Sequence, residues 1–152
     1  MKDFDYSTNG MYFVTVCTHN KAKILCNIVG EGLCALPQAN LTDIGRYVDN
    51  SIKHIHDNTD IYKNVFIEKH VIMPNHIHLL VFIKNETGGD GTPPLQNVIG
   101  AIKSYTTICY GKKLWQRSFH DHIVRDHDDY KKIYNYIESN PSRWTEDCFY
   151  TQ

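Results

Sequence analysis

Three pairs of histidines have the form His-x-His, a spacing with which two imidazoles can bind one metal ion. The pairs are His54 with His56, His76 with His78, and His120 with His122. Side chains two positions apart lie on the same face of a strand but on different faces of a helix. Imidazole is a common ligand of transition metals. Only a pair that lies on a strand can therefore direct both rings at one ion.

The pair His76 and His78 opens the apolar segment 76–83, HIHLLVFI, which is typical of a buried strand. The alternation predicts both histidines on one face together with Leu80 and Phe82. The opposite face is entirely apolar and is predicted to carry two helices. The pair at 54 and 56 falls in a predicted helix, whereas the pair at 120 and 122 falls in a predicted strand and could bind an ion. A lone His-x-His is a weak signal of a metal site, and core or surface histidines that bind no metal are the alternative.

A tyrosine outside the buried stripe of a predicted helix, 126–141, is the second candidate for chemistry. The stripe of this helix consists of Tyr130, Ile133, Tyr134 and Ile137. Tyr136 lies on a neighbouring face, which it shares with Lys132 and Asn140. If the helix covers the histidine side of the sheet, Tyr136 and Asn140 face His76 and His78. A half-exposed tyrosine at a packing interface is the alternative.

The elements that must position these residues follow from periodicity. Strands are predicted at 11–18, 63–73, 76–83 and 117–125, and helices at 41–57, with Thr42 as its cap, at 95–111 and at 126–141. Residues 24–36 are a weaker candidate for a hairpin that turns at Gly30-Glu31-Gly32. The order strand-helix-strand-strand-helix-strand-helix predicts an α+β, ferredoxin-like sandwich with a largely antiparallel sheet of four to five strands. The length predicts a single domain, 1–152.

Composition limits the class of protein. The net charge of −1 is no sign of nucleic-acid binding, but residues 103–143 contain eight Lys or Arg against five acidic residues. The cysteines at 17, 26, 34, 109 and 148 have no CxxC spacing, which predicts buried, reduced thiols. Neither a secretion signal nor an apolar run of about 18 residues is seen, so we expect a soluble cytoplasmic protein without a membrane partner.

Several motifs in this order resemble those of one protein family. MPNHIHLL, followed later by YIESNP, resembles the single-tyrosine HUH transposases, in which HUH means His-hydrophobic-His. Within them the chain looks most like the REP-associated tyrosine transposases and the related insertion-sequence transposases. The resemblance spans nearly the whole chain and also includes YFVTVCTHNKAKIL, IKSYTTICYGKKLWQRSFHDHIVR and DYKKIYNYIESNPSRW.

The resemblance implies a site and a reaction. His76 and His78 align with the metal ligands of the family, Asn140 with its third ligand, and Tyr136 with its nucleophile. The implied cofactor is Mg²⁺ or Mn²⁺. The implied activity is cleavage and rejoining of single-stranded DNA by transesterification, through a 5′-phosphotyrosine intermediate. The implied fold is a ferredoxin-like sheet with the tyrosine on an added C-terminal helix.

The implied partner is single-stranded DNA that carries a hairpin, and the implied location is the nucleoid. We expect backbone phosphates to be contacted by Lys103, Lys112, Lys113 and Arg117. Trp115 or Tyr105 is a candidate to stack on an unpaired base, and plain packing is the alternative for Trp115. Relatives act either as dimers with shared active sites or as monomers, so a homodimer is one expected state. The alternatives are an HUH replication initiator or relaxase, a catalytically silent hairpin-DNA-binding protein, and a zinc-dependent hydrolase.

Overall fold

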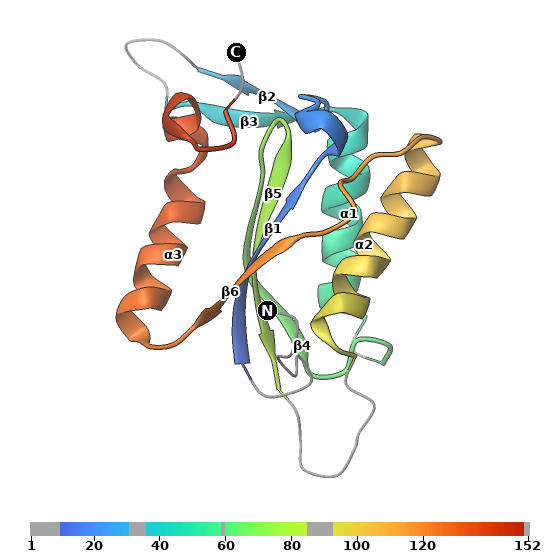
Figure 1. Cartoon of the computed structure of the whole chain (residues 1–152), viewed down its shortest axis with the longest axis vertical. Helices are drawn as coiled ribbons and strands as arrows, with labels where there is room; N and C mark the ends of the chain where they lie inside the picture. The colour runs from blue at the N-terminus through green and yellow to red at the C-terminus, as the bar shows by residue number, and fades with distance from the viewer. Residues whose placement is uncertain (1–9, 31–35, 59, 85–92, 151–152) are drawn as a thin grey trace.

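A computed structural model describes residues 10–30, 36–58, 60–84 and 93–150 of the chain. Its main sheet has four antiparallel strands in the spatial order β4-β5-β1-β6. These strands are β1 (Gly10–Cys17), β4 (Val65–Ile72), β5 (His76–Ile83) and β6 (His120–Val124). Figure 1 shows α1 (Asp43–Asp57) and α2 (Leu95–Tyr110) on one side of this sheet and α3 (His127–Ser139) on the other. The predicted α+β class, element order and largely antiparallel sheet are confirmed.

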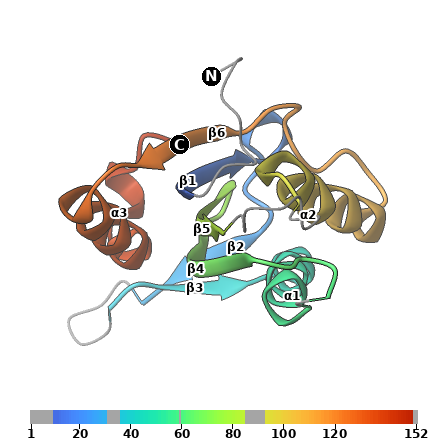
Figure 2. The same ribbon diagram turned by 90° about the horizontal axis from the view of Figure 1, so that it is seen from below.

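The alternation of β5 fixes which helices cover which face of the sheet. Ile77, Leu79, Val81 and Ile83 are all fully buried, and they form the larger core with the apolar residues of α1 and α2. Leu80 points the other way and packs against Ile133 and Ile137 of α3 in a second, smaller core. Figure 2 shows the main sheet from below, between α3 and the α1–α2 pair. His76 and His78 therefore lie on the face that α3 covers, as predicted.

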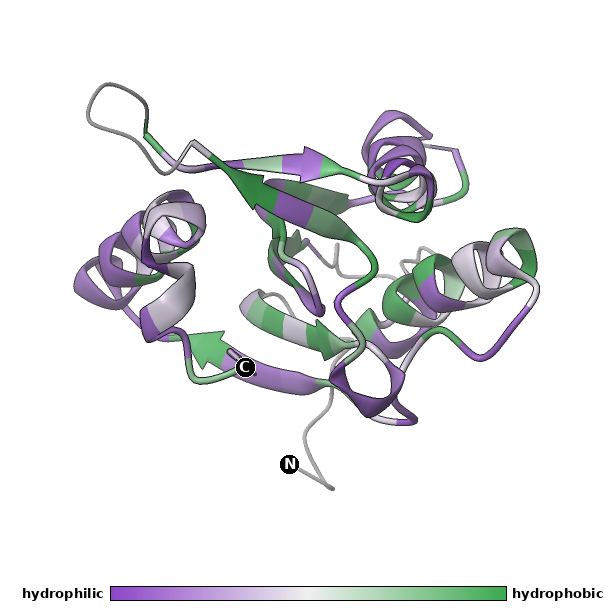
Figure 3. Cartoon of the chain, turned by 90° about the horizontal axis from the view of Figure 1, so that it is seen from above, coloured by the Kyte–Doolittle hydropathy of each residue, from purple (hydrophilic) through white to green (hydrophobic). Residues whose placement is uncertain are grey.

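A separate two-stranded sheet lies beyond the end of the main sheet at which β5 begins. It consists of β2 (Cys26–Val29) and β3 (Gln38–Leu41), which pair in antiparallel register. Figure 3 shows this hairpin extending across the molecule from the α3 side to the start of α1. The hairpin was predicted, but its second strand begins later than expected. Of the predicted turn, Gly30 is described, with φ at 106°, while residues 31–35 lie outside the described residues.

Capping residues mark the ends of the helices, and one of them, Thr42, was predicted. Thr42 Oγ1 accepts a hydrogen bond from the backbone N–H of Gly45 and begins α1, as predicted. Asp126 caps α3 in the same way, by accepting from the N–H of Asp129. Gly111 ends α2 in the left-handed region, with φ at 72°. No helix in the described ranges is both long and apolar enough to span a membrane.

Some predicted core positions are exposed in the structure. Cys109 and Cys148 are exposed, so the expectation of buried thiols is wrong for both, while Cys17 and Cys26 are buried. Cys34 lies outside the described residues. The predicted strand 117–125 is shorter in the structure, where β6 spans His120–Val124. Trp115, just before the predicted strand, forms an isolated bridge to Thr18.

Candidate functional site

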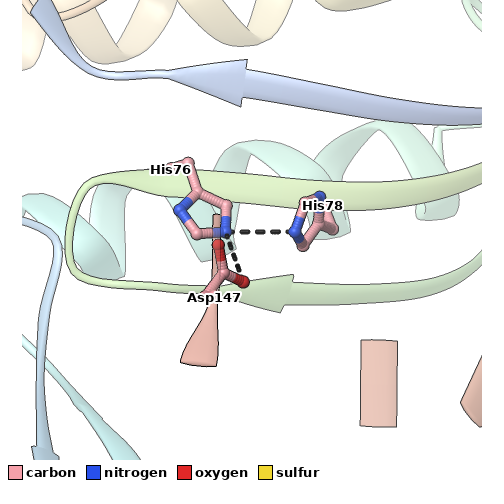
Figure 4. Close-up of side chains that lie close together, drawn as sticks. All are labelled: His76, His78 and Asp147. Atoms are coloured by element: carbon pink, nitrogen blue, oxygen red, sulfur yellow. Dashed lines mark hydrogen bonds and ion pairs between the residues drawn. The ribbon is translucent and has the colours of Figure 1, made fainter. Parts of the chain in front are cut away.

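The rings of His76 and His78 point toward each other from the start of β5. Their Nε2 atoms are 3.0 Å apart, and both rings are buried. Figure 4 shows the two rings side by side with the carboxylate of Asp147 below them. Two ligand atoms at this separation fit neighbouring positions on an octahedral ion that binds its ligands at about 2.1 Å. The pair therefore has the spacing of two ligands of one metal ion.

The other nitrogen of each ring has a polar partner that orients it. His76 Nδ1 is 2.9 Å from Asn75 Oδ1, and His78 Nδ1 is 2.8 Å from Thr15 Oγ1. A protonated Nδ1 that donates to such an oxygen leaves the lone pair of Nε2 free to bind a metal. Thr15 reaches His78 because the two are direct partners in the β1–β5 register. The site thus has the outer hydrogen bonds that metal-binding histidines require.

Burial keeps both imidazoles neutral, which is the protonation state that binds metal. Burial lowers the pKa of His76 to about 4, although the nearby carboxylate of Asp147 opposes this shift. Burial also lowers the pKa of His78 well below 6.5, and the neighbouring His76 lowers it further. A proton therefore competes weakly with a metal ion for either Nε2 atom at neutral pH.

Asp147 completes a group of three potential ligands that sequence reasoning missed. One of its oxygens, Oδ2, lies 3.9 Å from His76 Nε2, and the three ligand atoms all lie within 4.8 Å of one another. Among the described residues this is the group of histidine, cysteine and acidic side chains that could hold an ion. Asp147 comes directly after η2 (Pro141–Glu146), in a segment without periodicity. No sequence pattern therefore predicted that it lies near the histidines.

The phenol of Tyr136 lies beside this group. Its hydroxyl donates a hydrogen bond of 3.2 Å to Asp147 Oδ2, and its ring centre is 5.3 Å from that of His78. Burial raises the pKa of Tyr136 to about 12, and the negative charge of Asp147 contributes to that rise. The predicted proximity of Tyr136 to the histidine pair is confirmed, while its role as a nucleophile stays a prediction.

Asn140 is buried one helical turn beyond Tyr136. Its Nδ2 donates to Asp147 Oδ2 at 3.0 Å. Its Oδ1 is buried and has no hydrogen-bond partner among the residues that the structure describes, which is costly for an amide oxygen. This oxygen is free to bind a metal ion or water, so the expected role of Asn140 as a ligand stays a prediction beside that of Asp147.

The chain after η2 covers the histidines from the outside. The Phe149 ring lies 4.7 Å from the ring of His76, and the Phe149 carbonyl accepts a hydrogen bond from Asn75 Nδ2. Next to this cover is a cavity of about 150 Å³, lined by Tyr136, Ser139, Asn140, Arg143, Glu146 and Asp147. A second, wider hollow of about 580 Å³ adjoins it and is lined by Phe13, Lys132, Ile133, Asn135, Tyr136, Ser139 and Arg143. Tyr136 lines both hollows and can therefore be reached from outside.

The predicted DNA-contacting cations lie in the segment between α2 and β6. Lys112, Lys113 and Arg117 are exposed. The segment is attached to the end of β1, because the N–H of Gln116 donates to the carbonyl of Cys17. Cys17 pairs with His76 across the sheet, so these cations lie at the same end of the sheet as the histidines. Whether they contact DNA stays a prediction.

Lys103 and Trp115 are placed differently from what was expected. The Nζ atom of Lys103 donates to the carbonyls of Gln116 and Arg117, at 2.7 and 2.9 Å, and so holds the segment against α2. Trp115 is 3% exposed, and its Nε1 donates to Thr106 Oγ1 at 2.8 Å. A ring that is packed in the core has no free face for an unpaired base, so the expected stacking role of Trp115 is corrected to a structural one.

The other aromatic and histidine candidates also have definite places. Tyr105 is 47% exposed on α2, on the side of the sheet away from the histidines. His122 Nε2 lies 2.8 Å from Asp129 Oδ2, and this contact holds β6 to the start of α3. Neither His120 nor the pair on α1 belongs to a potential metal site within the described ranges.

Comparisons with solved structures show the same fold. A structure of "the REP associates tyrosine transposase bound to a REP hairpin" matches with a TM-score of 0.66 and 22% identity, over 95% of this chain and 74% of that one. A candidate transposase from Deinococcus radiodurans matches with a TM-score of 0.51 and 16% identity, over 91% of this chain and 96% of that one. At these identities the likeness is one of fold.

Comparison by sequence gives a relative. No model of a known protein family matches the chain. An uncharacterized protein of Haemophilus influenzae is 32% identical over an alignment of 171 residues, which covers 99% of this chain and 90% of the relative. At this identity and coverage, the chain belongs to the same family as that Haemophilus influenzae protein.

Proposed function

We propose that the chain is a metal-dependent HUH-type transposase that cleaves and rejoins single-stranded DNA through a 5′-phosphotyrosine at Tyr136. The observation that carries this proposal is the shared oxygen of Asp147. Its Oδ2 accepts the hydrogen bond of the Tyr136 hydroxyl and lies 3.9 Å from His76 Nε2. A potential nucleophile and a set of potential metal ligands are thus joined in one cluster, an arrangement suited to metal-assisted phosphoryl transfer by a tyrosine.

His76 and His78 would hold the ion, with Asp147, Asn140 or both supplying oxygen ligands. Two imidazoles with carboxylate and amide oxygens suit Mn²⁺, and Mg²⁺ accepts the oxygens. A bound divalent ion would polarise the scissile phosphate and offset its negative charge. The outer contacts of Thr15 and Asn75 hold the rings in the orientation that binding needs.

Tyr136 performs the bond exchange in this proposal. Its oxygen attacks phosphorus, the bond from phosphorus to the 3′-oxygen of the preceding nucleotide breaks, and that oxygen takes up a proton to become a free 3′-hydroxyl. The phenol gives up its own proton during the attack, since its pKa of about 12 keeps it protonated at neutral pH. Rejoining is the same exchange in reverse, so no energy source beyond the phosphotyrosine is needed.

The hollow beside Tyr136 is a path for a single strand. Phe13 offers a ring on which a base can stack, and its ring centre is 6.0 Å from that of Tyr136. Lys132 and Arg143 place positive charge along the same hollow. The exposed cations Lys112 and Arg117 would hold a duplex stem, and the hairpin bound by the structural neighbour supports a hairpin as the substrate.

A zinc-dependent hydrolase is the second candidate, and the observation that favours it is Asp147. Two histidines and a carboxylate are a common ligand set of catalytic zinc, in which a bound water attacks the substrate. The adjacent tyrosine favours the transposase, because a hydrolase that uses water as nucleophile does not need it. A silent hairpin-binding protein would share the fold and the cations but not the chemistry.

The test is incubation with a DNA oligonucleotide that contains a hairpin and single-stranded flanks, in the presence of Mn²⁺ or Mg²⁺. A covalent protein–DNA adduct that is absent from Tyr136→Phe supports the transposase, and Tyr134→Phe is the matched control from the same helix. Binding without an adduct identifies a silent hairpin-binding protein. Cleavage that survives Tyr136→Phe and leaves no adduct identifies a hydrolase.

A further inference from the structure

Lys21 lies in the turn after β1 and has no role in the site described above. Its turn packs next to the residues that precede His76. The turn is η1 (His19–Lys21), and Lys21 is exposed. Within the described part of the chain, no ion pair or hydrogen bond of the Lys21 ammonium is found. Its positive charge is therefore available to an anion.

The turn is held by hydrogen bonds that lead directly to His76. Thr18, which is fully buried, donates its hydroxyl to the carbonyls of Ala22 and Asn75, at 2.9 and 3.0 Å. Asn75 Oδ1 in turn lies 2.9 Å from His76 Nδ1. Beyond the turn, the N–H groups of Ile24 and Leu25 both donate to the carbonyl of Pro74. The chain around Lys21 thus wraps the residues that precede the first histidine.

The backbone of the turn is in an uncommon conformation. Asn20 and Lys21 have φ angles of 54° and 53°, in the left-handed region that residues with a Cβ atom rarely adopt. Such conformations persist only where the surrounding contacts enforce them, and they are frequent at ligand-binding sites. Here the enforcing contacts are those of Thr18, so the backbone of the turn is held next to Asn75, the residue before His76.

The electrostatic field of Lys21 reaches the site. Burial lowers the pKa of His76, Asp147 opposes that shift, and the charge of Lys21 lowers the pKa further. Burial raises the pKa of the thiols of Cys17 and Cys148, and Lys21 opposes both of these shifts. Cys17, four residues before Lys21, pairs with His76 across the sheet, so the turn that carries Lys21 begins beside the histidine site.

We propose that the Lys21 ammonium binds a phosphate of the DNA strand at the mouth of the histidine site and so positions the strand for attack by Tyr136. This inference rests on the proposed function, which it deepens by naming a positioning residue. Asp147, one of the potential ligands, is acidic and repels an incoming phosphate. An ammonium at the rim attracts the phosphate and would add to the positive charge of a bound ion.

Lys23 supplies a matched control. It is also exposed and lies two residues further along the same segment, but its Nζ lies 5.2 Å from the centre of the Tyr150 ring. The variants Lys21→Gln and Lys23→Gln remove the same charge from the same region. Lys21→Arg restores the charge, and Lys21→Gly removes the side chain while it favours the left-handed turn. The Gly variant keeps the test valid if Gln disturbs the turn.

The experiment measures binding of a fluorescein-labelled hairpin oligonucleotide by anisotropy over a series of KCl concentrations. Lys21→Gln and Lys21→Gly are expected to reduce the slope of log affinity against log salt by about 0.7, the value for one contact to a single-stranded phosphate. Lys21→Arg should restore the slope, and Lys23→Gln should leave it near that of the wild type. Equal slopes for Lys21→Gln and Lys23→Gln would overturn the proposal.

A second arm identifies the phosphate. The affinities of the wild type and of Lys21→Gln are measured for oligonucleotides that each carry one neutral methylphosphonate in place of one phosphate. At the phosphate that Lys21 contacts, neutralisation should weaken wild-type binding and have no further effect on Lys21→Gln. If each methylphosphonate reduces the affinity of both proteins by the same factor, the inference is contradicted.

The two proposals fail in different ways. A wild-type protein that binds the oligonucleotide but forms no adduct with Tyr136 contradicts the transposase, and both binding arms still decide the role of Lys21. A wild-type protein that forms the adduct, together with an unchanged slope in Lys21→Gln, contradicts the lysine alone. A wild-type protein that binds no DNA overturns both.

Discussion

The hydroxyl of Tyr136 donates a hydrogen bond of 3.2 Å to Oδ2 of Asp147, the oxygen that also lies 3.9 Å from His76 Nε2. Asn140 donates to the same oxygen at 3.0 Å. One carboxylate oxygen therefore connects α3, which carries Tyr136 and Asn140, to the histidines of β5. A change in the charge or position of Asp147 should therefore alter both the pKa of the Tyr136 phenol and the binding of a metal ion by the histidines.

We predict that Asp147→Asn lowers the pKa of Tyr136 from its value of about 12. Burial is the main cause of that raised pKa, and the negative charge of Asp147 is the next, so removal of the charge leaves burial as the main remaining cause. Asn140→Ala should shift the pKa upward, because the hydrogen bond of Asn140 lowers it. The measurement is a pH titration of tyrosine ring carbons by NMR, with Tyr136→Phe for assignment. An unchanged pKa in Asp147→Asn would contradict the hydrogen bond.

We predict that Asp147→Ala weakens binding of Mn²⁺ by at least about tenfold, as measured by titration calorimetry. Asn140→Ala should weaken it less, because a carboxylate oxygen of Asp147 lies within 4.8 Å of a nitrogen of each histidine and carries a negative charge that the neutral amide of Asn140 lacks. Glu146→Ala is the control, since this neighbouring carboxylate is exposed and pairs with Arg143. A larger loss in Asn140→Ala than in Asp147→Ala would restore the asparagine as the main oxygen ligand.

The histidine face and Tyr136 could be predicted from the sequence because both depend on local periodicity. Alternation within 76–83 fixed which side of the sheet carries His76 and His78, and the helical repeat of 126–141 separated Tyr136 from the buried stripe. The structure agrees on both, since Leu80 packs with Ile133 and Ile137 on the same face. The resemblance to a family added the roles of these residues, which periodicity cannot give.

Asp147 and Lys21 could not be predicted in this way, because neither lies in a regular helix or strand. Asp147 comes near the histidines only because the chain turns back at η2. Lys21 lies in a turn whose backbone is in the left-handed region. Trp115 was misjudged for a related reason. It is flanked by basic and polar residues, but its segment bridges to Thr18 and turns the indole into the core.

We predict that the metal-free protein loses stability as the pH falls from about 6.5 to about 4. The pKa of His76 in the fold is about 4, below its ordinary value of 6.5, so the unfolded chain takes up a proton first as the pH falls. The stability contribution of the neutral ring is thus fully present above about pH 6.5 and decreases below it. His78, whose pKa burial also lowers, acts in the same direction.

The measurement is urea denaturation of wild type and His76→Gln at about pH 7.5 and about pH 5, in the presence of a chelator. The wild type should lose more free energy of unfolding between the two pH values than the variant does, because the variant has no imidazole at 76 to protonate. A loss of the same size in both proteins would show that His76 is not the group responsible.

We predict that Trp115→Phe reduces the free energy of unfolding by about 1–3 kcal/mol and leaves the salt dependence of hairpin-DNA binding unchanged. The indole is buried, and its Nε1 donates to Thr106 Oγ1 at 2.8 Å, a bond that phenylalanine cannot make. The double variant Lys112→Ala/Lys113→Ala is the counterpart from the same segment. Both lysines are exposed, so it should weaken DNA binding and reduce its salt dependence with little effect on unfolding. If Trp115→Phe instead weakens DNA binding while stability is kept, the indole must leave the core to meet a base, and its assignment as a structural residue is wrong.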